Sequence, residues 1–294
     1  MTDMDDRADT NRLGQYLAAR RALVSPEQVG MPSGARRRVP GLRREEVAML
    51  AGISADYYLR LERGRDDNPS AQVLEALARV LLLDEVETEY LITLASGRPR
   101  ARRPRRAERV PARLEHLLAT IAVPAFVEGR HFDVLAANDL AVALSPRLTP
   151  GQNRLRSLLL DPEERAFHAD WEQAVVDMVA AFRRSIGNDV SDPRAVEVVG
   201  ELSLASARFR TLWARQDVRR LEGNTAEIEH PVLGSLRLHR EKLPVGGLLL
   251  VLYYPEAGSD AADKLRLLGS LAQPTGDDGR PGGAVPAGTA PPGP

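Results

Sequence analysis

Residues Val47 to Gly64, VAMLAGISADYYLRLERG, place a glycine and a serine inside an otherwise helical run. Val47 and Leu50 recur at helical spacing and mark the apolar face of a first helix. Gly52 follows this run and fits the left-handed turn that often ends a helix. Ser54 is a good N-cap for a new helix, because its hydroxyl can accept an otherwise unpaired backbone N–H. The stretch therefore predicts two short helices that meet at a fixed, steep angle.

The second of these helices divides its residues between two faces. Tyr58 and Leu61 are three residues apart, so they share the face that we expect to point inward. The opposite face carries Ala55, Asp56, Tyr57 and Arg60. Two helices joined in this way form a helix-turn-helix, whose second helix is built to enter the DNA major groove.

A purely structural interpretation has to be weighed, because any small helical hairpin needs a glycine and an inward apolar face. Three further features favour DNA binding. Arginines at 36–38, with Arg43 and Arg44, come just before the first helix, and arginine occupies the outer face of the second. A further amphipathic helix with Ser70 as its predicted cap makes the hairpin part of a compact bundle.

The stretch GLRREEVAMLAGISADYYLRLERGRDDNPS, residues 41–70, resembles the helix-turn-helix of the Xre/Cro/lambda-repressor family. Matching by position to this family implies that Arg44 starts the second bundle helix and reaches a phosphate. The DNA-binding residues that we expect are Arg43, Arg44, Ser54, Ala55, Asp56, Tyr57 and Arg60. Arg60 is suited to guanine O6 and N7, whereas Asp56 either accepts from cytosine N4 or pairs with Arg60 one turn on.

Composition narrows the class of protein. The chain has 294 residues, enough for two domains, and its formal net charge is −1, so a DNA-binding charge must be local. It has no cysteine, which excludes disulfides and thiolate metal sites. The apolar runs are too short for a membrane span, and the acidic N-terminus is unlike a secretory signal. We therefore expect a cytoplasmic protein with no membrane partner.

Changes of pattern divide the chain into five parts. We expect a disordered N-terminus at 1–10, a helix-turn-helix DNA-binding domain at 11–97, an arginine-rich linker at 98–110, a second folded domain at 111–272 and a disordered Pro/Gly-rich tail at 273–294. The linker cannot form a packed core; it is either a solvated spacer or an additional phosphate contact.

The C-terminal half predicts a sheet with helices. Two strand-like runs flank Gly129 and Arg130, several helices follow, and then come three strands, TAEIEHPVL, GSLRLHREKL and GGLLLVLYYP, before a last helix. This order indicates an α+β domain with a five-stranded antiparallel sheet. The predicted fold class is therefore multi-domain, an all-α bundle followed by an α+β domain.

Four stretches of this half resemble, in order, the Xre regulators that carry an MmyB-like ligand-binding domain. They are FDVLAAN, DWEQAVVDMVAAFR, GELSLASARFRTLWARQDV and HPVLGSLRL. The resemblance covers about residues 11–270 and implies a PAS-like fold with a cavity for a small apolar ligand, for which a fatty acid is the candidate. The ligand-binding residues that we expect are Asn138, Phe182, Leu212, Trp213, Arg215, Arg219 and His230. The two arginines and His230 would face the carboxylate head group.

Some of the residues assigned to ligand binding are also suited to purely structural roles. Asn138 is equally suited to cap the following helix, and Trp213 to fill the core. The chain also departs from its relatives twice: Ala137 stands where they often carry tryptophan, and Gln216 where they often carry histidine. The first change would enlarge a pocket, and the second removes a titratable group.

Catalysis is not expected. The five histidines are scattered without metal-ligand spacing, and there is no phosphate-binding glycine loop and no nucleophile elbow. We predict no catalytic or metal-binding residues and no cofactor. The sequence predicts a transcriptional regulator that binds double-stranded DNA and senses a ligand. The alternative is a DNA-associated module whose C-terminal domain forms a homodimer or recruits a partner without sensing a ligand.

Overall fold

The computed structural model describes residues 11–32, 39, 41–66, 68–96, 108–187, 192–220 and 223–272. Four predictions lie wholly or mainly outside these residues. They concern the N-terminus at 1–10, the arginines at 36–38, the linker at 98–110 and the tail at 273–294.

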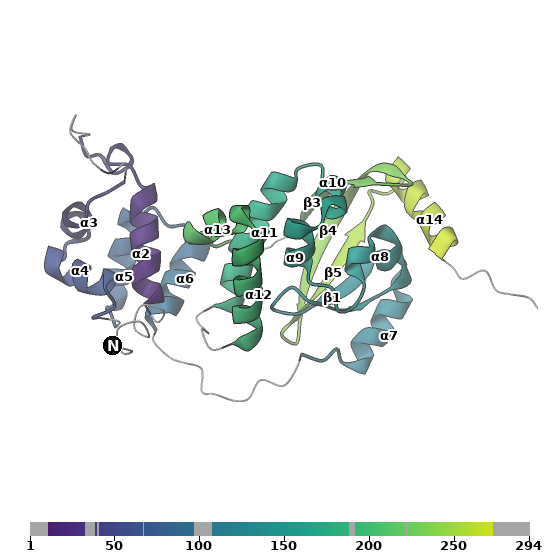
Figure 1. The fold of residues 1–294 in the computed structure, drawn as a ribbon, viewed down its shortest axis with the longest axis horizontal. Coiled ribbons are helices and arrows are strands. Elements are labelled where there is room, and N and C mark those ends of the chain that lie inside the picture. Colours follow the sequence, from purple (N-terminus) through teal and green to yellow (C-terminus); the bar gives the residue numbers. More distant parts are fainter. Residues whose placement is uncertain are drawn as a thin grey trace, which may run out of the picture.

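The N-terminal part is a helical bundle at one end of the molecule (Figure 1). Its α-helices are α2 (Arg12–Leu23), α3 (Arg44–Ala51), α4 (Ala55–Glu62), α5 (Ala71–Val80) and α6 (Glu85–Ala95), and a 3-10 turn, η1, covers Glu27–Val29. Side chains cap the helices as their residue types predict: Asn11 caps α2, Ser54 caps α4 and Ser70 caps α5.

The bundle closes around residues that share helical faces. Tyr16, Tyr58 and Leu61 are completely buried, and so is Val47 of the first helix of the hairpin. The Tyr16 ring meets the Tyr90 ring edge to face, with 5.3 Å between centroids. The inward face predicted from the spacing of Tyr58 and Leu61 is therefore confirmed.

The C-terminal part contains a five-stranded antiparallel sheet, as predicted. Its strands lie in the order β2-β1-β5-β4-β3. Their bounds are β1 (Ala125–Glu128), β2 (Val134–Ala137), β3 (Asn224–His230), β4 (Gly234–Val245) and β5 (Leu248–Tyr254). β1 and β2 form the predicted hairpin around Gly129, and the last three strands form a meander.

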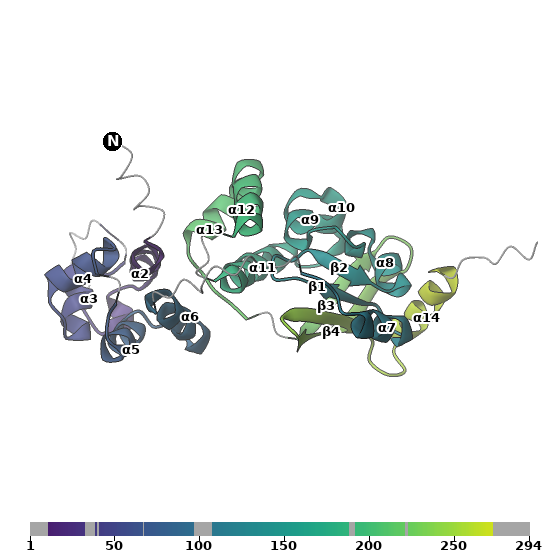
Figure 2. The same cartoon turned by 90° about the horizontal axis from the view of Figure 1, so that it is seen from below.

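Helices cover both faces of this sheet (Figures 1 and 2). α7 (Ala112–Thr120) packs on one face over β1 and β5. α8 (Asp139–Leu144), η2 (Pro146–Leu148) and α14 (Asp260–Ala272) share a core with the other face. A separate helical core joins α9 (Arg154–Leu160), α11 (Trp171–Ile186), α12 (Pro193–Ala205) and α13 (Ala207–Ala214). Between α9 and α11, α10 (Pro162–Phe167) contacts β3, and the break before Pro162 matches the prediction.

Candidate nucleic-acid interface and ligand pocket

The corner between α3 and α4 has the geometry that its glycine and serine predict. Gly52 has φ 69°, which only glycine adopts without strain. The next amide, of Ile53, donates to the Ala48 carbonyl at 2.9 Å and completes the turn. The Ser54 hydroxyl accepts the Tyr57 N–H at 3.1 Å and opens α4. The chain thus reverses between two short helices without a long loop.

The outer face of α4 combines charge with an aromatic ring. Ala55 and Asp56 are exposed, and Arg60 forms an ion pair with Asp56 one turn earlier. The Arg60 guanidinium also lies 5.4 Å from the centre of the Tyr57 ring. Of the two roles left open for Asp56, the structure contains the pairing with Arg60. The carboxylate of Asp56 and the ring of Tyr57 together hold the planar guanidinium on the outer face of α4.

Arg43 and Arg44 lie at the start of α3. Arg43 is exposed at the N-cap, where its amide donates to Glu46. Arg44 is half exposed and its Nε lies 2.5 Å from the Glu62 carboxylate. Glu62 also binds Arg21 of α2 at 2.6 Å, and its own side chain is 3% exposed. A single buried carboxylate therefore fixes Arg44 at the helix start.

Glu62 was missed by the sequence analysis. A glutamate near the end of an amphipathic helix is ordinarily a solvated residue, and no local spacing distinguishes this one. Its two partners are 18 and 41 residues away along the chain. The cluster forms only because α2, α3 and α4 pack against one another in the folded bundle.

The residues expected to bind a ligand are dispersed over several elements. Asn138 takes the plainer role: it caps α8 through the Ala141 N–H at 2.9 Å and also donates to the Val123 carbonyl at 2.8 Å. Phe182, Leu212 and Trp213 belong to the helical core of α9 and α11–α13. There Trp213 lies 6.1 Å from the Phe182 ring, between centroids.

The three expected head-group residues have other partners. Arg215 pairs with Asp217 at 2.9 Å, and Arg219 pairs with Asp177 at 2.6 Å. His230 lies at the end of β3, where its Nδ1 accepts the Leu233 N–H at 3.1 Å. The structure therefore does not gather the seven expected residues around one space.

The hollows in the described part of the ligand domain include a groove and a charged recess. A groove of about 890 Å³ lies between α7, β2, the start of α8, and α14. Its walls are mostly apolar, and of the seven expected ligand residues only Asn138 lines either hollow. Ala137 lines the same groove. The groove residues are Glu115, Leu118, Ala119, Ile121, Leu135, Ala136, Ala137, Asn138, Asp139, Leu140, Pro150, Arg266, Gly269 and Ser270.

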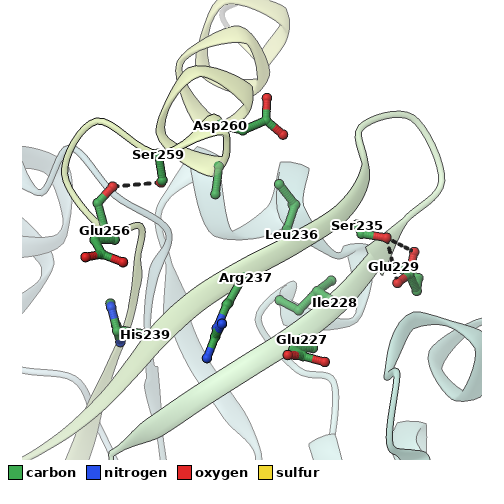
Figure 3. Close-up of a pocket in the computed structure, with 11 residues that line it drawn as sticks. Glu227, Ile228, Glu229, Ser235, Leu236, Arg237, His239, Glu256, Ser259 and Asp260 are labelled. Atoms are coloured by element: carbon green, nitrogen blue, oxygen red, sulfur yellow. Dashed lines mark hydrogen bonds between the residues drawn. The ribbon is translucent and has the colours of Figure 1, made fainter.

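The other hollow, about 590 Å³, lies over β3, β4 and the start of α14 (Figure 3). Its surface is more strongly charged than that of the groove. Its lining includes four carboxylates but only one arginine and one histidine. The carboxylates belong to Glu227, Glu229, Glu256 and Asp260, and the other two residues are Arg237 and His239. This excess of negative charge disfavours a carboxylate ligand.

A buried ionic cluster lies on the sheet face that α8 and α9 cover. Glu128 is fully buried and accepts from Arg154 and from Lys242, each at 3.0 Å. Burial lowers the pKa of Lys242 to about 8, against the attraction of Glu128. Burial alone would raise the pKa of Glu128, but the two cations lower it below its ordinary value. No local sequence pattern around these three residues predicts the cluster.

Comparison with known families agrees with this geometry. Residues 110–268 match the MmyB-like transcription regulator ligand binding domain, and residues 12–91 match a helix-turn-helix domain. The chain belongs to the MmyB-like family of transcription regulators. No curated protein matches it. The MmyB-like match contains the sheet, the buried ionic cluster and the groove except for Gly269 and Ser270, and the helix-turn-helix match contains α2–α5 and the first part of α6.

Two further kinds of feature, a metal-binding cluster and a membrane-spanning helix, are not found among the described residues. These residues contain no cluster of three His, Asp or Glu side chains that could hold a metal ion. Within the same residues, no helix is long and apolar enough to cross a membrane. The family points to a transcription regulator that binds DNA and carries a ligand-binding domain.

Proposed function

We propose that the regulator reads its operator with the outer face of α4 and senses a long-chain fatty acid with its MmyB-like domain. The observation that carries the DNA part is the outer face of α4, where Ala55 and Asp56 are exposed and Arg60 is partly exposed, directly after the turn at Gly52 and the cap at Ser54. In this proposal Ser54 lies close to the backbone, Tyr57 and Arg60 meet base edges, and Arg43 and Arg44 bind phosphates.

For the ligand we favour the groove between α7, β2 and α14. Its volume lies within the range of small-molecule sites, and its walls include Leu118, Leu135 and Leu140. Arg266 lies on its border, where it is nearly 80% exposed and pairs with Asp263. An acyl chain would cover the leucines and leave its carboxylate near Arg266.

The first test concerns the phosphate contacts. Arg44→Ala is expected to weaken binding to all DNA sequences alike and to make the log–log salt slope shallower by about one unit. Removing Arg44 leaves Glu62 paired with Arg21, so the fold should persist. Fluorescence anisotropy over a range of salt concentrations measures the slope.

The matched control for this test is Arg113→Ala, an exposed arginine on α7 of the ligand domain. Its salt slope should equal that of the unmodified protein. An unchanged slope for Arg44→Ala would remove Arg44 from the interface.

The second test concerns the groove. Palmitate at 100 times its dissociation constant should stabilise the fold by about 2.7 kcal/mol, whereas octanoate at the same concentration should stabilise it much less. Ala119→Trp places a large ring at the groove wall and should abolish the effect of palmitate. Differential scanning calorimetry of the full chain measures both.

Ala112→Trp is the control, because Ala112 is exposed on the same helix and does not line the groove. It should respond to palmitate like the unmodified protein. Equal stabilisation of both tryptophan variants would place the acyl chain elsewhere, and stabilisation of neither the variants nor the unmodified protein would contradict fatty-acid binding.

A further inference from the structure

A short segment of the ligand domain, residues 215–220, connects to the DNA-binding bundle by a shared arginine. Arg20 of α2 binds Asp217 at 3.0 Å and Glu87 of α6 at 2.7 Å. All three side chains are less than one-fifth exposed. Asp217 is thus the ligand-domain member of a charge cluster that otherwise belongs to the bundle.

The next residue makes an apolar contact with the same surface. Val218 is 2% exposed and lies in the core cluster formed by the bundle helices. Within the described chain, it is the one buried member of that cluster that comes from beyond residue 95. A valine buried there removes apolar surface from water only while the two domains are in contact.

Further polar contacts between the two domains lie around Asp217 and Val218. Glu89 of α6 accepts from Arg184 at 3.1 Å and from Arg220 at 3.3 Å. Arg12, at the start of α2, donates to the carbonyl of Gly187 at the end of α11. These outer pairs are more exposed than Asp217 and Val218, so salt should weaken them first.

The segment is also tied to the helical core of the ligand domain. Gln216 has φ 60°, a left-handed conformation that is uncommon for a residue other than glycine. Its side chain accepts from Arg183 at 2.5 Å. The Arg183 guanidinium lies 3.7 Å from the centre of the Trp213 ring and donates to the Trp213 carbonyl. Trp213 in turn packs in the core of α11 and α13.

The contact leaves the DNA-reading helices uncovered. In Figure 1, α3 and α4 lie on the side of the bundle away from the ligand domain, whereas α6 lies toward α11 and α13. The ligand domain therefore does not block α4 by occupying its outer face. It fixes the orientation of the bundle instead.

We infer that residues 215–220 form a clasp that locks the DNA-binding bundle onto the ligand domain. Asp217 and Val218 hold the bundle, and Gln216 holds the clasp to Arg183. A ligand-induced rearrangement that includes the helical core around Trp213 would be transmitted to α2 through this segment. This last step rests on the proposed ligand sensing, whereas the lock itself does not.

The proposed contact between the two domains is tested by measuring the distribution of distances between a label on each domain. The chain has no cysteine, so Glu75→Cys on α5 and Leu204→Cys on α12, both exposed, accept spin labels cleanly. Pulsed dipolar spectroscopy should give one narrow distance distribution in this labelled protein. Adding Asp217→Asn with Val218→Ser should broaden it, and Asp217→Asn alone should broaden it less.

Glu172→Gln is the matched control, because it removes a partner of Arg208 that lies within the ligand domain and outside residues 215–220. Its distribution should stay narrow. A broad distribution without clasp substitutions, or a narrow one in the double variant, would overturn the lock. Circular dichroism checks that each variant is folded.

The same variants separate the clasp from the proposed sensing. If palmitate changes the operator affinity of the unmodified protein by about five-fold or more, the double clasp variant should reduce that change to less than about two-fold while retaining stabilisation by palmitate. An undiminished change would overturn the route through the clasp. If palmitate neither stabilises the unmodified protein nor changes its operator affinity, the sensing proposal fails, and the distance measurement still decides the lock.

Discussion

Glu128→Gln should lower the free energy of unfolding by about 3–5 kcal/mol, because it leaves two buried cations without their shared carboxylate. Glutamine keeps the volume of glutamate and removes its charge. Arg154 and Lys242, which are 5% and 1% exposed at their side chains, cannot reach water to compensate. Urea unfolding of the full chain measures the loss.

Glu201→Gln provides the comparison, since it breaks a glutamate–arginine pair at 2.7 Å on the surface. Arg156 and Glu201 are 61% and 39% exposed at their side chains, and such pairs contribute about 0–1 kcal/mol. If Glu128→Gln lowered the free energy of unfolding no more than Glu201→Gln does, the result would contradict a buried, water-excluded ionic cluster.

The same cluster predicts a pH dependence with a definite sign. Between about pH 8 and about pH 10.5, unfolded Lys242 keeps its proton while buried Lys242 releases it. The unfolded state then binds more protons, so the contribution of Lys242 to stability rises with pH in this window. Lys242→Met should lack that rise. In acid the sign is the same: because folding lowers the pKa of Glu128, the unfolded state again binds more protons, and the contribution of Glu128 to stability is lost as pH falls from its ordinary pKa through the folded value.

Arg60→Ala should weaken binding to the cognate operator by about 1–3 kcal/mol, or roughly five- to 150-fold, and relax one base position. Arg60 points outward from α4, between Asp56 and the Tyr57 ring, where it can form two hydrogen bonds with one base edge. Selection from randomised DNA identifies the operator, and the same selection with the variant shows which position is relaxed.

Arg79→Ala, at an exposed position on α5, is the control and should leave the selected sequence unchanged. Asp56→Ala separates the two roles of Asp56. If it only holds Arg60, its variant should relax the same base position as Arg60→Ala. If it reads a cytosine, a different position should relax. Selection of the same sequence by Arg60→Ala and by the unmodified protein would exclude Arg60 as a base reader.

The helix-turn-helix was predictable because its signals are local. Gly52 has the positive φ that a helix end requires, Ser54 binds an amide three residues on, and Tyr58 and Leu61 share a face through helical geometry alone. The strands and their antiparallel arrangement were predictable for a similar reason: the β1–β2 hairpin and the three-strand meander join neighbours in sequence. Their joining into one sheet, through β1 and β5, is long-range.

The ligand residues were less predictable, because an aliphatic or aromatic side chain has the same pattern whether it lines a hollow or fills a core. Phe182, Leu212 and Trp213 lie in a filled helical core, and Asn138 is used as a cap. Ala137 and Asn138 border the groove, whose other walls come from α7 and α14, so no local pattern indicates it.

By itself, the sequence determined the elements whose bonds and faces span a few residues: the capped helices of the bundle, the corner before α4, and the alternation of strands and helices. Only the tertiary structure decided where charge is buried. Glu62 and Glu128 each bind two cations far away along the chain, and Asp217 binds Arg20 across 197 residues. The physical reason is that the strength of a charge pair depends on distance and on exclusion of water, and both are set by packing of distant segments rather than by residue type.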